Sequence, residues 1–415
     1  MTSLRHITFL ILTGLFCLPA TAQTLGFRQA LSKARSSSPT LKVLKYNTGM
    51  AEADLITART RQNLNLNNQT LQMVHPENFA KDTKFNQPQN RQVWWQLTKP
   101  VALNNQRHYK IEAARKSITV AEQNYMDAER SVLLEVGNKW LDVWYNKMTL
   151  DLAEQARRNV DTLSQTQQIR LKNEVISKAD YTRTQLLLSQ YNLQLKSAQQ
   201  NYQNELLNLA FLTGTAVSGI DASDGVAEQV FSCTADSLVE RALRQRPDVL
   251  AAQSSIEAAQ ANAILQRKLA LPVPELGGIW NPQNTVPYAG IFATIQIPIF
   301  DRNQGAIRKA RVSLEQARET LNGLQTQMQT EIQISCASYY VNKNIVEQYG
   351  DILDQSEDVL HSVQYAYTRG GTTIIDFLDA QRNWYDTRKL YYEALYNYRK
   401  SYLQLLFTTG IINQL

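Results

Sequence analysis

The sequence predicts a mainly α-helical chain that contains two structural repeats and a small number of β-strands. Three observations lead to this prediction: short motifs that recur at a fixed spacing, long stretches without proline, and stretches in which apolar and polar residues alternate. The chain has 415 residues, of which 43% are hydrophobic and 19% are charged. This composition is neither that of a disordered chain nor that of a helical membrane protein.

Internal repetition defines the predicted organisation. The segment 210–214 (AFLTG) recurs 196 residues later as 406–410 (LFTTG), and Asp180-Tyr181 recurs at the same spacing as Asp376-Phe377. Recurrence over such a period indicates a duplicated structural unit. The predicted boundaries are repeat 1 at 23–214, a linker at 215–235 and repeat 2 at 236–415.

Proline placement predicts the helices of each repeat. No proline lies between Pro100 and Pro247, or after Pro298. Proline in a helix interior costs ~3 kcal/mol, so these gaps permit long helices. Each repeat is expected to contain an opening helix, two strands, a long helix and a shorter returning helix. The predicted ranges are 26–61, 62–103, 105–173 and 179–212 in repeat 1, and 236–268, 271–300, 303–369 and 375–408 in repeat 2.

Helix lengths and apolar spacing favour an elongated coiled coil. The long helices would each extend ~100 Å at a rise of 1.5 Å per residue. Apolar residues in the second of them follow the spacing of a coiled-coil seam, at Val341, Ile345, Ile352, Val359 and Val363. Two long helices and two stacked pairs of shorter ones would form a hollow cylinder wall of even height.

The predicted strands alternate in polarity and suit the wall of a membrane barrel. Val93, Trp95 and Leu97 alternate with more polar neighbours, and the same alternation runs through 291–299. Strands of ~9–11 residues can cross a bilayer at a tilt. Four strands cannot close a barrel, whose smallest stable form has about eight, so the chain would have to oligomerise as a dimer or a trimer. A soluble hairpin packed on its own helices is the alternative.

The first 22 residues predict a secretory signal peptide. Arg5 precedes an apolar run at 7–18, and small residues at 20–22 provide a cleavage site. The mature chain then contains two cysteines, Cys233 and Cys336, which could pair in an oxidising compartment or stay apart. The formal net charge of +6 predicts either a solvated surface of mixed sign or a basic patch with a partner.

No motif of enzyme chemistry occurs in the sequence. After the predicted signal only three histidines remain, at His75, His108 and His361, and none has acids or cysteines at metal-ligand spacing. There is no glycine loop for phosphate and no nucleophile elbow. We therefore expect neither an enzyme nor a cofactor, and no resident metal.

Near the end of the second strand pair, the segment 295–305 (IQIPIFDRNQG), followed by Ala310 and Gln316-Ala317, is similar to the strand-to-helix signature of the TolC superfamily of outer-membrane efflux proteins, nearest its CzcC-like heavy-metal branch. The resemblance covers nearly all of residues 24–412. It implies a mainly α fold with a small membrane β-barrel portion: a homotrimer with a 12-stranded barrel, made from four strands per protomer, and a periplasmic α-helical tunnel. It also implies partners: outer-membrane lipid, a periplasmic membrane-fusion adaptor and an inner-membrane RND pump or ABC transporter, but no nucleic acid.

The resemblance also assigns roles at the two helix reversals. Asp376 and Asp379 match carboxylates that form rings around a closed periplasmic entrance, although a helix-capping role for Asp376 and a first-turn position for Asp379 are compatible with the same residues. Asp180 and Tyr367 match an aspartate–tyrosine link that closes the entrance. A second link of the family uses an arginine where this sequence has Thr372, so that link should be absent.

Adaptor contact is implied at the same reversals. The matching residues are Arg170, Leu171, Val175, Ser177, Gly370 and Gly371. The first reversal departs from the family at Glu174, where a glycine is usual, and this puts the fit of the adaptor there in doubt. The expected function is a passive outer-membrane duct for efflux, with heavy-metal cations as the substrate. Multidrug efflux and type I secretion are alternatives, and a periplasmic coiled-coil scaffold or a hydrolase would be functions of another class.

Overall fold

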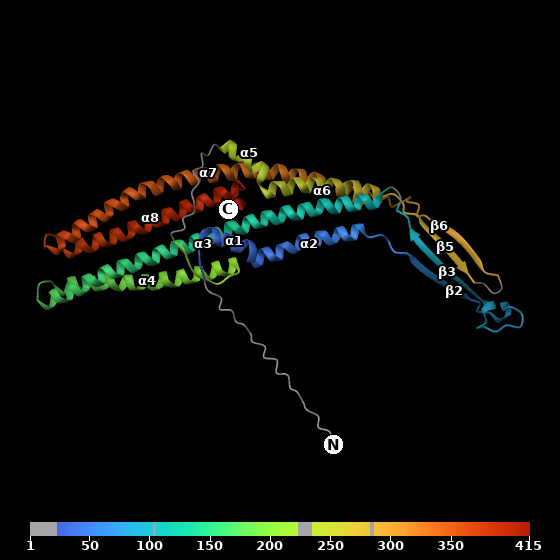
Figure 1. Cartoon of the computed structure of the whole chain (residues 1–415), viewed down its shortest axis with the longest axis horizontal. Helices are drawn as coiled ribbons and strands as arrows, with labels where there is room; N and C mark the ends of the chain where they lie inside the picture. Colours follow the sequence, from blue (N-terminus) through green and yellow to red (C-terminus); the bar gives the residue numbers. More distant parts are fainter. Residues whose placement is uncertain (1–22, 103–104, 223–234, 283–285) are drawn as a thin grey trace, which may run out of the picture. The chain divides into compact units, whose positions relative to one another are not determined.

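The computed structural model describes residues 23–102, 105–222, 235–282 and 286–415. The predicted signal peptide, Cys233 and most of the predicted linker lie outside these residues. The described chain is mainly helical and contains one four-stranded sheet, which confirms the predicted fold class (Figure 1). Within the described ranges, no helix combines the length and the apolar character needed to cross a membrane.

The opening helix of each half is broken in two, which corrects the prediction of one helix at 26–61 and one at 236–268. The first consists of α1 (Phe27–Ser37) and α2 (Pro39–Arg59), and the second of α5 (Ala235–Gln245) and α6 (Pro247–Leu269). Both breaks precede a proline, whose ring disfavours helical backbone at the residue before it. Ser38 has φ −53° and ψ 125°, and Arg246 has φ −69° and ψ 121°, so both are non-helical.

Two further helices follow the strands in each half. They are α3 (Gln106–Lys172), α4 (Lys178–Thr213), α7 (Gln304–Thr368) and α8 (Ile374–Thr408). α4 and α8 both end in a glycine with left-handed backbone, with φ 66° at Gly214 and 74° at Gly410. A residue without Cβ adopts this conformation without strain, so it ends both helices at equivalent positions.

The sheet has the order β2-β3-β5-β6 and is antiparallel throughout. Its strands are β2 (Asn65–Gln72), β3 (Arg91–Pro100), β5 (Glu275–Asn281) and β6 (Tyr288–Thr294). Trp95 of β3 lies opposite Trp280 of β5, and this central pairing joins the two halves of the chain. β2 and β6 each have one strand partner among the described residues, so both are edges of the sheet.

β6 ends at Thr294, although the alternating pattern predicted a strand up to residue 299. Thr294 pairs with Glu275, so the next positions of the partner chain would be Pro274 and Val273, followed by Pro272. Proline has no N–H group to donate to a neighbouring strand. In addition, the carbonyl of Pro274 already accepts the N–H of Val101 on the other side, at 2.8 Å. The segment 295–300 therefore has no strand to pair with.

The chain forms two compact units, and each unit draws on both halves of the sequence. Unit 1 comprises Met1–Ser38, Lys139–Ala227 and Leu353–Glu393, in its described parts. Unit 2 comprises Pro39–Asn138, Glu228–Ile352 and Ala394–Leu415.

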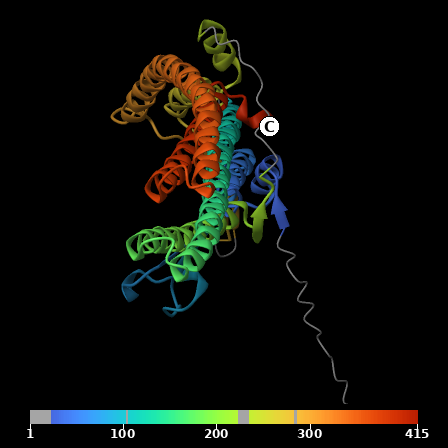
Figure 2. The same ribbon diagram turned by 90° about the vertical axis from the view of Figure 1, so that its left-hand side faces the viewer.

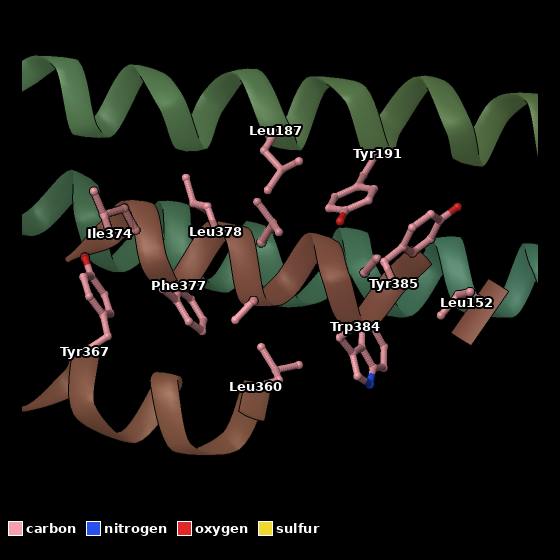
Figure 3. Packing of buried hydrophobic residues seen from close by; sticks show 13 residues of the cluster. Leu152, Leu187, Tyr191, Leu360, Tyr367, Ile374, Phe377, Leu378, Trp384 and Tyr385 are labelled. Atoms are coloured by element: carbon pink, nitrogen blue, oxygen red, sulfur yellow. The ribbon is translucent and has the colours of Figure 1, made fainter. Parts of the chain in front are cut away.

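Unit 1 has an apolar core between α3, α4, α7 and α8. Figure 3 shows side chains from these four helices meeting in it. Tyr191 and Tyr385 contact each other with ring centroids 5.2 Å apart, and burial raises the pKa of both hydroxyl groups. The core includes Val160 of α3 and Tyr367 of α7, which precede the two helix reversals, and Ile374 of α8, which follows the second one.

The N-terminal strand of unit 1 is fixed by Trp140. β1 (Gln23–Leu25) pairs in parallel with β4 (Val217–Ile220), and the two lie side by side in Figure 2. Trp140 is fully buried, its indole N–H donates to the carbonyl of Leu25 at 3.0 Å, and its ring meets Phe27 edge-on. The predicted mature N-terminus is therefore held from its first described residues.

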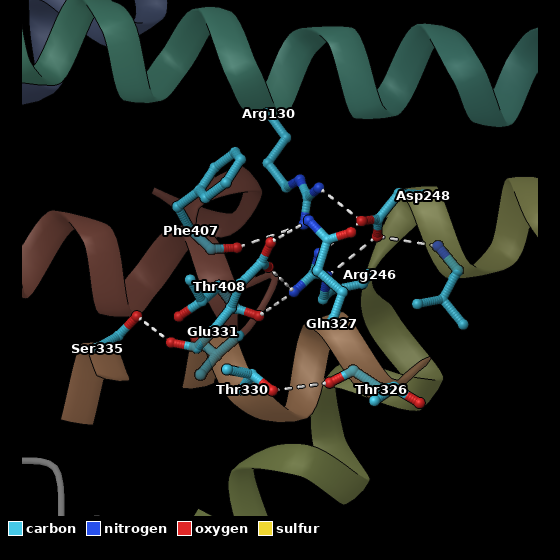
Figure 4. A network of polar contacts seen from close by, with 12 residues as sticks. Arg130, Arg246, Asp248, Thr326, Gln327, Thr330, Glu331, Ser335, Phe407 and Thr408 are labelled. Atoms are coloured by element: carbon cyan, nitrogen blue, oxygen red, sulfur yellow. Dashed lines mark hydrogen bonds and ion pairs between the residues drawn. The ribbon is translucent and has the colours of Figure 1, made fainter. Parts of the chain in front are cut away.

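Unit 2 contains a buried network of charges (Figure 4). Arg246 is 2% exposed and contacts Asp248 at 2.6 Å, Glu331 at 3.0 Å and the carbonyl of Thr408 at 3.1 Å. Arg130 contacts the same Asp248 at 3.0 Å. Burial tends to raise the pKa of Asp248, but the hydrogen bonds from Arg246 and the two positive charges outweigh it and lower that pKa. The network ties α3, α6, α7 and the end of α8 together. Cys336 is buried in α7 nearby.

Candidate functional site at the helix reversals

The two helix reversals of unit 1 share one backbone geometry. After α3, Glu174 N–H donates to Leu171 and Val175 N–H donates to Arg170, at 3.0 and 2.9 Å. After α7, the amides of Gly370 and Gly371 donate in the same pattern, to Tyr367 and Ala366 at 3.1 and 2.9 Å. This pair of bonds is a Schellman motif, which requires left-handed backbone at its turning residue. That residue is Glu174 in one reversal, with φ 56°, and Gly370 in the other, with φ 76°.

The returning helices also begin alike. Ser177 caps α4: its hydroxyl accepts the N–H of Asp180 at 3.1 Å and donates to the carboxylate of Asp180 at 2.7 Å. Thr373 stands before α8, accepts the N–H of Asp376 at 3.2 Å, and donates its own N–H to the carboxylate of Asp376 at 3.1 Å. These reciprocal bonds satisfy amides that a helix start leaves without partners.

Asp376 is held by three donors and stays ionised more readily than usual. The hydroxyl groups of Thr373 and Thr372 donate to its carboxylate at 2.6 and 2.7 Å, together with the amide of Thr373. The Thr373 hydroxyl, the Thr372 hydroxyl and this amide lower the pKa of Asp376, in that order of size. The helix-capping role predicted as compatible with this residue is therefore present, and the carboxylate is solvent-exposed.

Asp180 and Asp379 each face an arginine one turn along their own helix. Asp180 lies 3.2 Å from Arg183 of α4, and Asp379 lies 4.0 Å from Arg382 of α8, with 67% of its side chain exposed. The two arginines and Asp379 line a groove of about 350 Å³ between α4 and α8, with Leu186, Leu187, Gln190, Ile375 and Leu378. Two of the four predicted gate residues thus sit in or beside one groove.

Tyr367 lies in the core rather than at the surface. It is 9% exposed and stacks on Phe377 with centroids 5.4 Å apart and ring planes 4° from parallel. Gln167 donates to its hydroxyl at 3.2 Å, and the Arg170 guanidinium lies 5.5 Å from its ring. In the single chain, Asp180 and Tyr367 therefore have separate partners, and the link between them stays a prediction.

A cavity of about 410 Å³ adjoins Tyr367. It is lined from α3, α7 and α8, and includes Arg170, His361 and Trp384. Trp384 is 2% exposed, and its indole N–H, like the side-chain amide nitrogen of Gln381, has no hydrogen-bond partner among the described residues. Sequence reasoning missed Gln167, although Gln167 precedes Arg170 by one helical turn on the same α3 face.

The residues predicted to contact an adaptor surround the reversals. Val175 is 67% exposed and the neighbouring Ile169 is 63% exposed. Ser177, Gly370 and Gly371 are exposed, whereas Arg170 and Leu171 are half-buried. The tip of α3 and α4 therefore presents apolar side chains to solvent. No cluster of three or more possible metal ligands occurs in the parts of the chain that the structure describes.

Comparison with known proteins finds a family match over part of the chain. The Outer membrane efflux protein family matches residues 238–410, which include the whole of α6, both strands β5 and β6, and helices α7 and α8. The match is supported by a relative along almost the whole chain, the cobalt-zinc-cadmium resistance protein CzcC of Cupriavidus metallidurans, at 24% identity over 90% of this chain and 87% of that protein. The family match covers residues 238–410, and together with this relative it supports an outer-membrane efflux protein.

The chain is also similar to other proteins. It is 21% identical to the outer membrane protein TolC of Vibrio cholerae, over 73% of each chain. Its fold is similar to that of CusC, with a TM-score of 0.77, 15% identity and 93% coverage of both chains. It is also similar to the Neisseria gonorrhoeae MtrE outer membrane channel in its open state, with a TM-score of 0.76, 15% identity and coverage of 93% and 89%. These likenesses establish the fold.

Proposed function

We propose that this protein is the outer-membrane channel of a tripartite efflux system and conducts its substrate passively. The observation that carries the proposal is an apolar face on the four-stranded sheet that no other described element covers. Residues of this face remain largely accessible, from Trp95 at 43% to Ile291 at 95%. The others are Leu66, Leu97, Leu276 and Trp280, at 67, 47, 51 and 47%. Exposed apolar surface of this extent indicates a membrane or a partner.

Assembly from several copies would complete the sheet and cover the remaining apolar surface. The edges β2 and β6 leave four strands open, and closure needs about eight or more, so a homotrimer would supply twelve. Helices also carry exposed apolar stripes, at Val43, Tyr46, Met50 and Ile56 of α2 and at Val341, Ile345, Ile352 and Val359 of α7. Their spacing follows the coiled-coil pattern, so neighbouring copies would pack along them.

The helix reversals would form the periplasmic entrance. Threefold symmetry would bring three copies of Asp376 and of Asp379 together around a narrow axis, where their charges favour cations and repel one another. The capping bonds of Asp376 fix its backbone without neutralising it. An Asp180–Tyr367 link would then hold the entrance closed. To form this link, the Tyr367 hydroxyl would give up its bond with Gln167 and pair with Asp180, while its ring stays stacked on Phe377.

The same tips would dock a periplasmic adaptor, which connects to an inner-membrane RND pump or an ABC transporter. Exposed Ile169 and Val175 offer it apolar contacts beside Arg170. Likeness to CzcC favours heavy-metal cations as the transported substrate. Likeness to the pyoverdine export protein OpmQ of Pseudomonas putida, at 23% identity over 67% of this chain, supports an organic substrate as the second candidate.

Single-channel recording in planar bilayers tests both the channel and its gate. We expect cation-preferring conductance from the purified oligomer, and a larger conductance for Asp180→Ala and for Tyr367→Phe. Two matched variants distinguish loss of the Asp180–Tyr367 link from general loss of stability. Gln167→Leu breaks the in-chain bond but keeps the Tyr367 hydroxyl, and Asp161→Ala removes an aspartate that pairs with Arg157 along α3.

The outcomes are distinct. Both control variants should conduct like the original protein. If Tyr367→Phe opens no wider than the original protein, or if Gln167→Leu opens as widely as Tyr367→Phe, the Asp180–Tyr367 gate is wrong. A monomer that needs no detergent and forms no channel would instead contradict the membrane function itself.

A further inference from the structure

Basic residues gather where the helices of unit 2 meet the sheet. Neither α3 nor α7 has an acidic residue in its first turn. In the first two turns of α3, the residues before Glu112 carry only positive charges. The first two turns of α7 carry only positive charges throughout. The ends of α2 and α6 that lie beside the same strands are basic as well. We call this set the basic belt: Arg59, Arg61, Lys99, Arg107, Lys110, Arg267, Lys268, Arg308, Lys309 and Arg311.

Local helix electrostatics explain only part of the belt. Cations at a helix C-terminus are favourable because the helix dipole is negative there, which accounts for Arg59, Arg267 and Lys268. At a helix N-terminus the dipole is positive, so Arg107 in the first turn of α3 is placed against this preference. The helix dipole gives no reason for the cations one turn further on, which are Lys110 of α3 and Arg308, Lys309 and Arg311 of α7.

Side chains at the starts of α3 and α7 hold the helix ends of the belt next to one another. Buried Gln106 donates from the start of α3 to the carbonyls of Lys268 and Leu271, at 2.8 and 3.0 Å. Asn303 donates from the start of α7 to the carbonyl of Gln266 at 2.8 Å. Arg107 donates to the carbonyl of Arg59 at the end of α2. The four helix ends are thereby joined next to the strands.

A groove of about 580 Å³ opens within the belt. Four cations line it, Arg61, Lys99, Arg107 and Lys110, together with apolar residues at the strand ends: Pro100, Val101, Ala102 and Val273. No aspartate or glutamate belongs to its described lining. Arg61, Lys99 and Lys110 are exposed and form no ion pair with any described residue.

None of the acids nearest in sequence, Asp54, Glu112, Glu275 and Asp301, lines the groove. Asp301 accepts the N–H of Asn303 at 2.9 Å, and Glu112 faces Arg115 at 3.8 Å. Glu275 pairs across the sheet with Pro100 but does not line the groove. The described lining of the groove therefore contains four cations and no acidic residue.

We propose that this groove binds the headgroup of an anionic phospholipid, with the phosphate among Arg61, Lys99 and Lys110. Basic clusters beside a membrane segment attract anionic headgroups, and lysine and arginine donate strong charge-assisted bonds to phosphate oxygens. The apolar lining at the ends of β3 and before β5 then contacts the glycerol and the first acyl carbons. This inference rests on the proposed membrane function, because it places the sheet in the bilayer and the belt at its periplasmic surface.

Native mass spectrometry of the delipidated, detergent-purified oligomer tests the site. The probes are palmitoyl-oleoyl phosphatidylglycerol and palmitoyl-oleoyl phosphatidylcholine, which share their acyl chains and differ in charge. The test variant is Arg61→Gln/Lys99→Gln/Lys110→Gln; Arg107 is retained because it supports α2. The control Lys42→Gln/Lys45→Gln/Lys196→Gln removes three exposed cations from outside the belt.

We expect phosphatidylglycerol to bind at least tenfold more tightly than phosphatidylcholine, and the test variant to lose at least tenfold in affinity while the control keeps it. Millimolar glycerol 3-phosphate should not displace the lipid. Equal binding of the two lipids to the original protein overturns the proposal even if the test variant does not fold. An equal loss in the control also overturns it, as does full displacement by glycerol 3-phosphate, which would identify a site for free phosphate.

Two further readouts separate this inference from the alternatives. If the test variant falls apart into monomers at unchanged lipid binding, the belt is an interface between copies and the proposal fails. If the original protein conducts in bilayers but shows no lipid preference, the inference fails while the proposed function stands. If it neither inserts nor conducts, the proposed function fails first.

Discussion

Glu174 and Gly370 occupy equivalent positions 196 residues apart, and both have left-handed backbone, with φ 56° and 76°. The same equivalence links Gly214 with Gly410, whose φ angles are 66° and 74°. The duplicated halves therefore share their turning points as well as their helices. Only the first reversal has a residue with a Cβ at this point.

Glu174→Gly should stabilise the first reversal. Left-handed backbone costs a non-glycine residue ~1–2 kcal/mol, of which part is offset by the greater freedom of glycine in the unfolded chain, so we expect a gain of about 0.5–1 kcal/mol. The Glu174 side chain has no partner among the described residues, so nothing else is lost. Hydrogen exchange of the amides at 171–180 should slow. Gly370→Ala is the reverse control and should speed exchange at 367–376. Unchanged exchange in both variants would show that the left-handed backbone at Glu174 is not strained.

Asp376 should keep its charge below pH 4. Its pKa is lowered by Thr373 and Thr372, so the ionised form stabilises the folded reversal. This contribution is present above the unfolded pKa of ~3.9 and is lost as pH falls through the lower folded pKa. Thr372→Val removes one donor, which should move the pKa of Asp376 upward.

Reversal potentials of the channel between pH 5 and pH 3 check this shift. Cation preference should decline at a higher pH in Thr372→Val than in the original protein. Thr368→Val is the matched control, because the Thr368 hydroxyl donates to the carbonyl of Tyr365 and not to Asp376. Identical pH profiles for the two variants would show that Thr372 does not set the charge at the entrance.

Arg246→Ala should destabilise unit 2 severely. Without Arg246, Glu331 and the carbonyl of Thr408 lose this donor, and Asp248 loses one of its two arginines. Breaking a buried ion pair in this way costs ~3–5 kcal/mol. Arg244→Ala removes a solvent-exposed arginine that pairs with Glu240 along α5, which should change the free energy of unfolding by less than ~0.5 kcal/mol. Thermal unfolding of both purified variants gives the comparison. Similar melting temperatures would mean that the network adds little.

Trp140→Phe and Trp384→Phe should differ although both rings are buried. Trp140 donates to Leu25, so its replacement loses a buried hydrogen bond, whereas Trp384 has a buried N–H without a partner. An unsatisfied buried donor costs ~1–3 kcal/mol, and its removal should offset part of the lost packing. In thermal or denaturant unfolding, we expect Trp140→Phe to be about 1–2 kcal/mol less stable than Trp384→Phe. Equal losses would indicate that a water molecule in the adjoining cavity accepts from Trp384.

The sequence predicted the helical fold class because its signals are local. Proline-free stretches and recurring helix ends depend on backbone chemistry that acts over a few residues. The breaks before Pro39 and Pro247 were equally visible in the sequence, although each opening segment was predicted as a single helix. The end of β6 was not visible from its own alternation, because it depends on the prolines of the opposing strand.

Prediction of the candidate site divides in the same way. Ser177 with Asp180, and Thr373 with Asp376, show the spacing of a helix cap in the sequence, so their local bonds could be anticipated. The partners of Tyr367 could not, because Gln167 lies 200 residues away on another helix. Nothing in the alternation of polar and apolar residues specifies which helix face meets that hydroxyl. The basic belt likewise exists only once four helix ends meet.

The open edges of the sheet have a consequence for inheritance. β2 and β6 each have one open edge. A copy with one damaged edge would therefore still offer an intact edge and could enter the assembly. If the proposed homotrimer assembles at random in a cell that makes both forms in equal amounts, only about one trimer in eight would contain intact copies alone. Edge mutations should therefore be dominant, whereas mutations that prevent the chain from folding at all should be recessive.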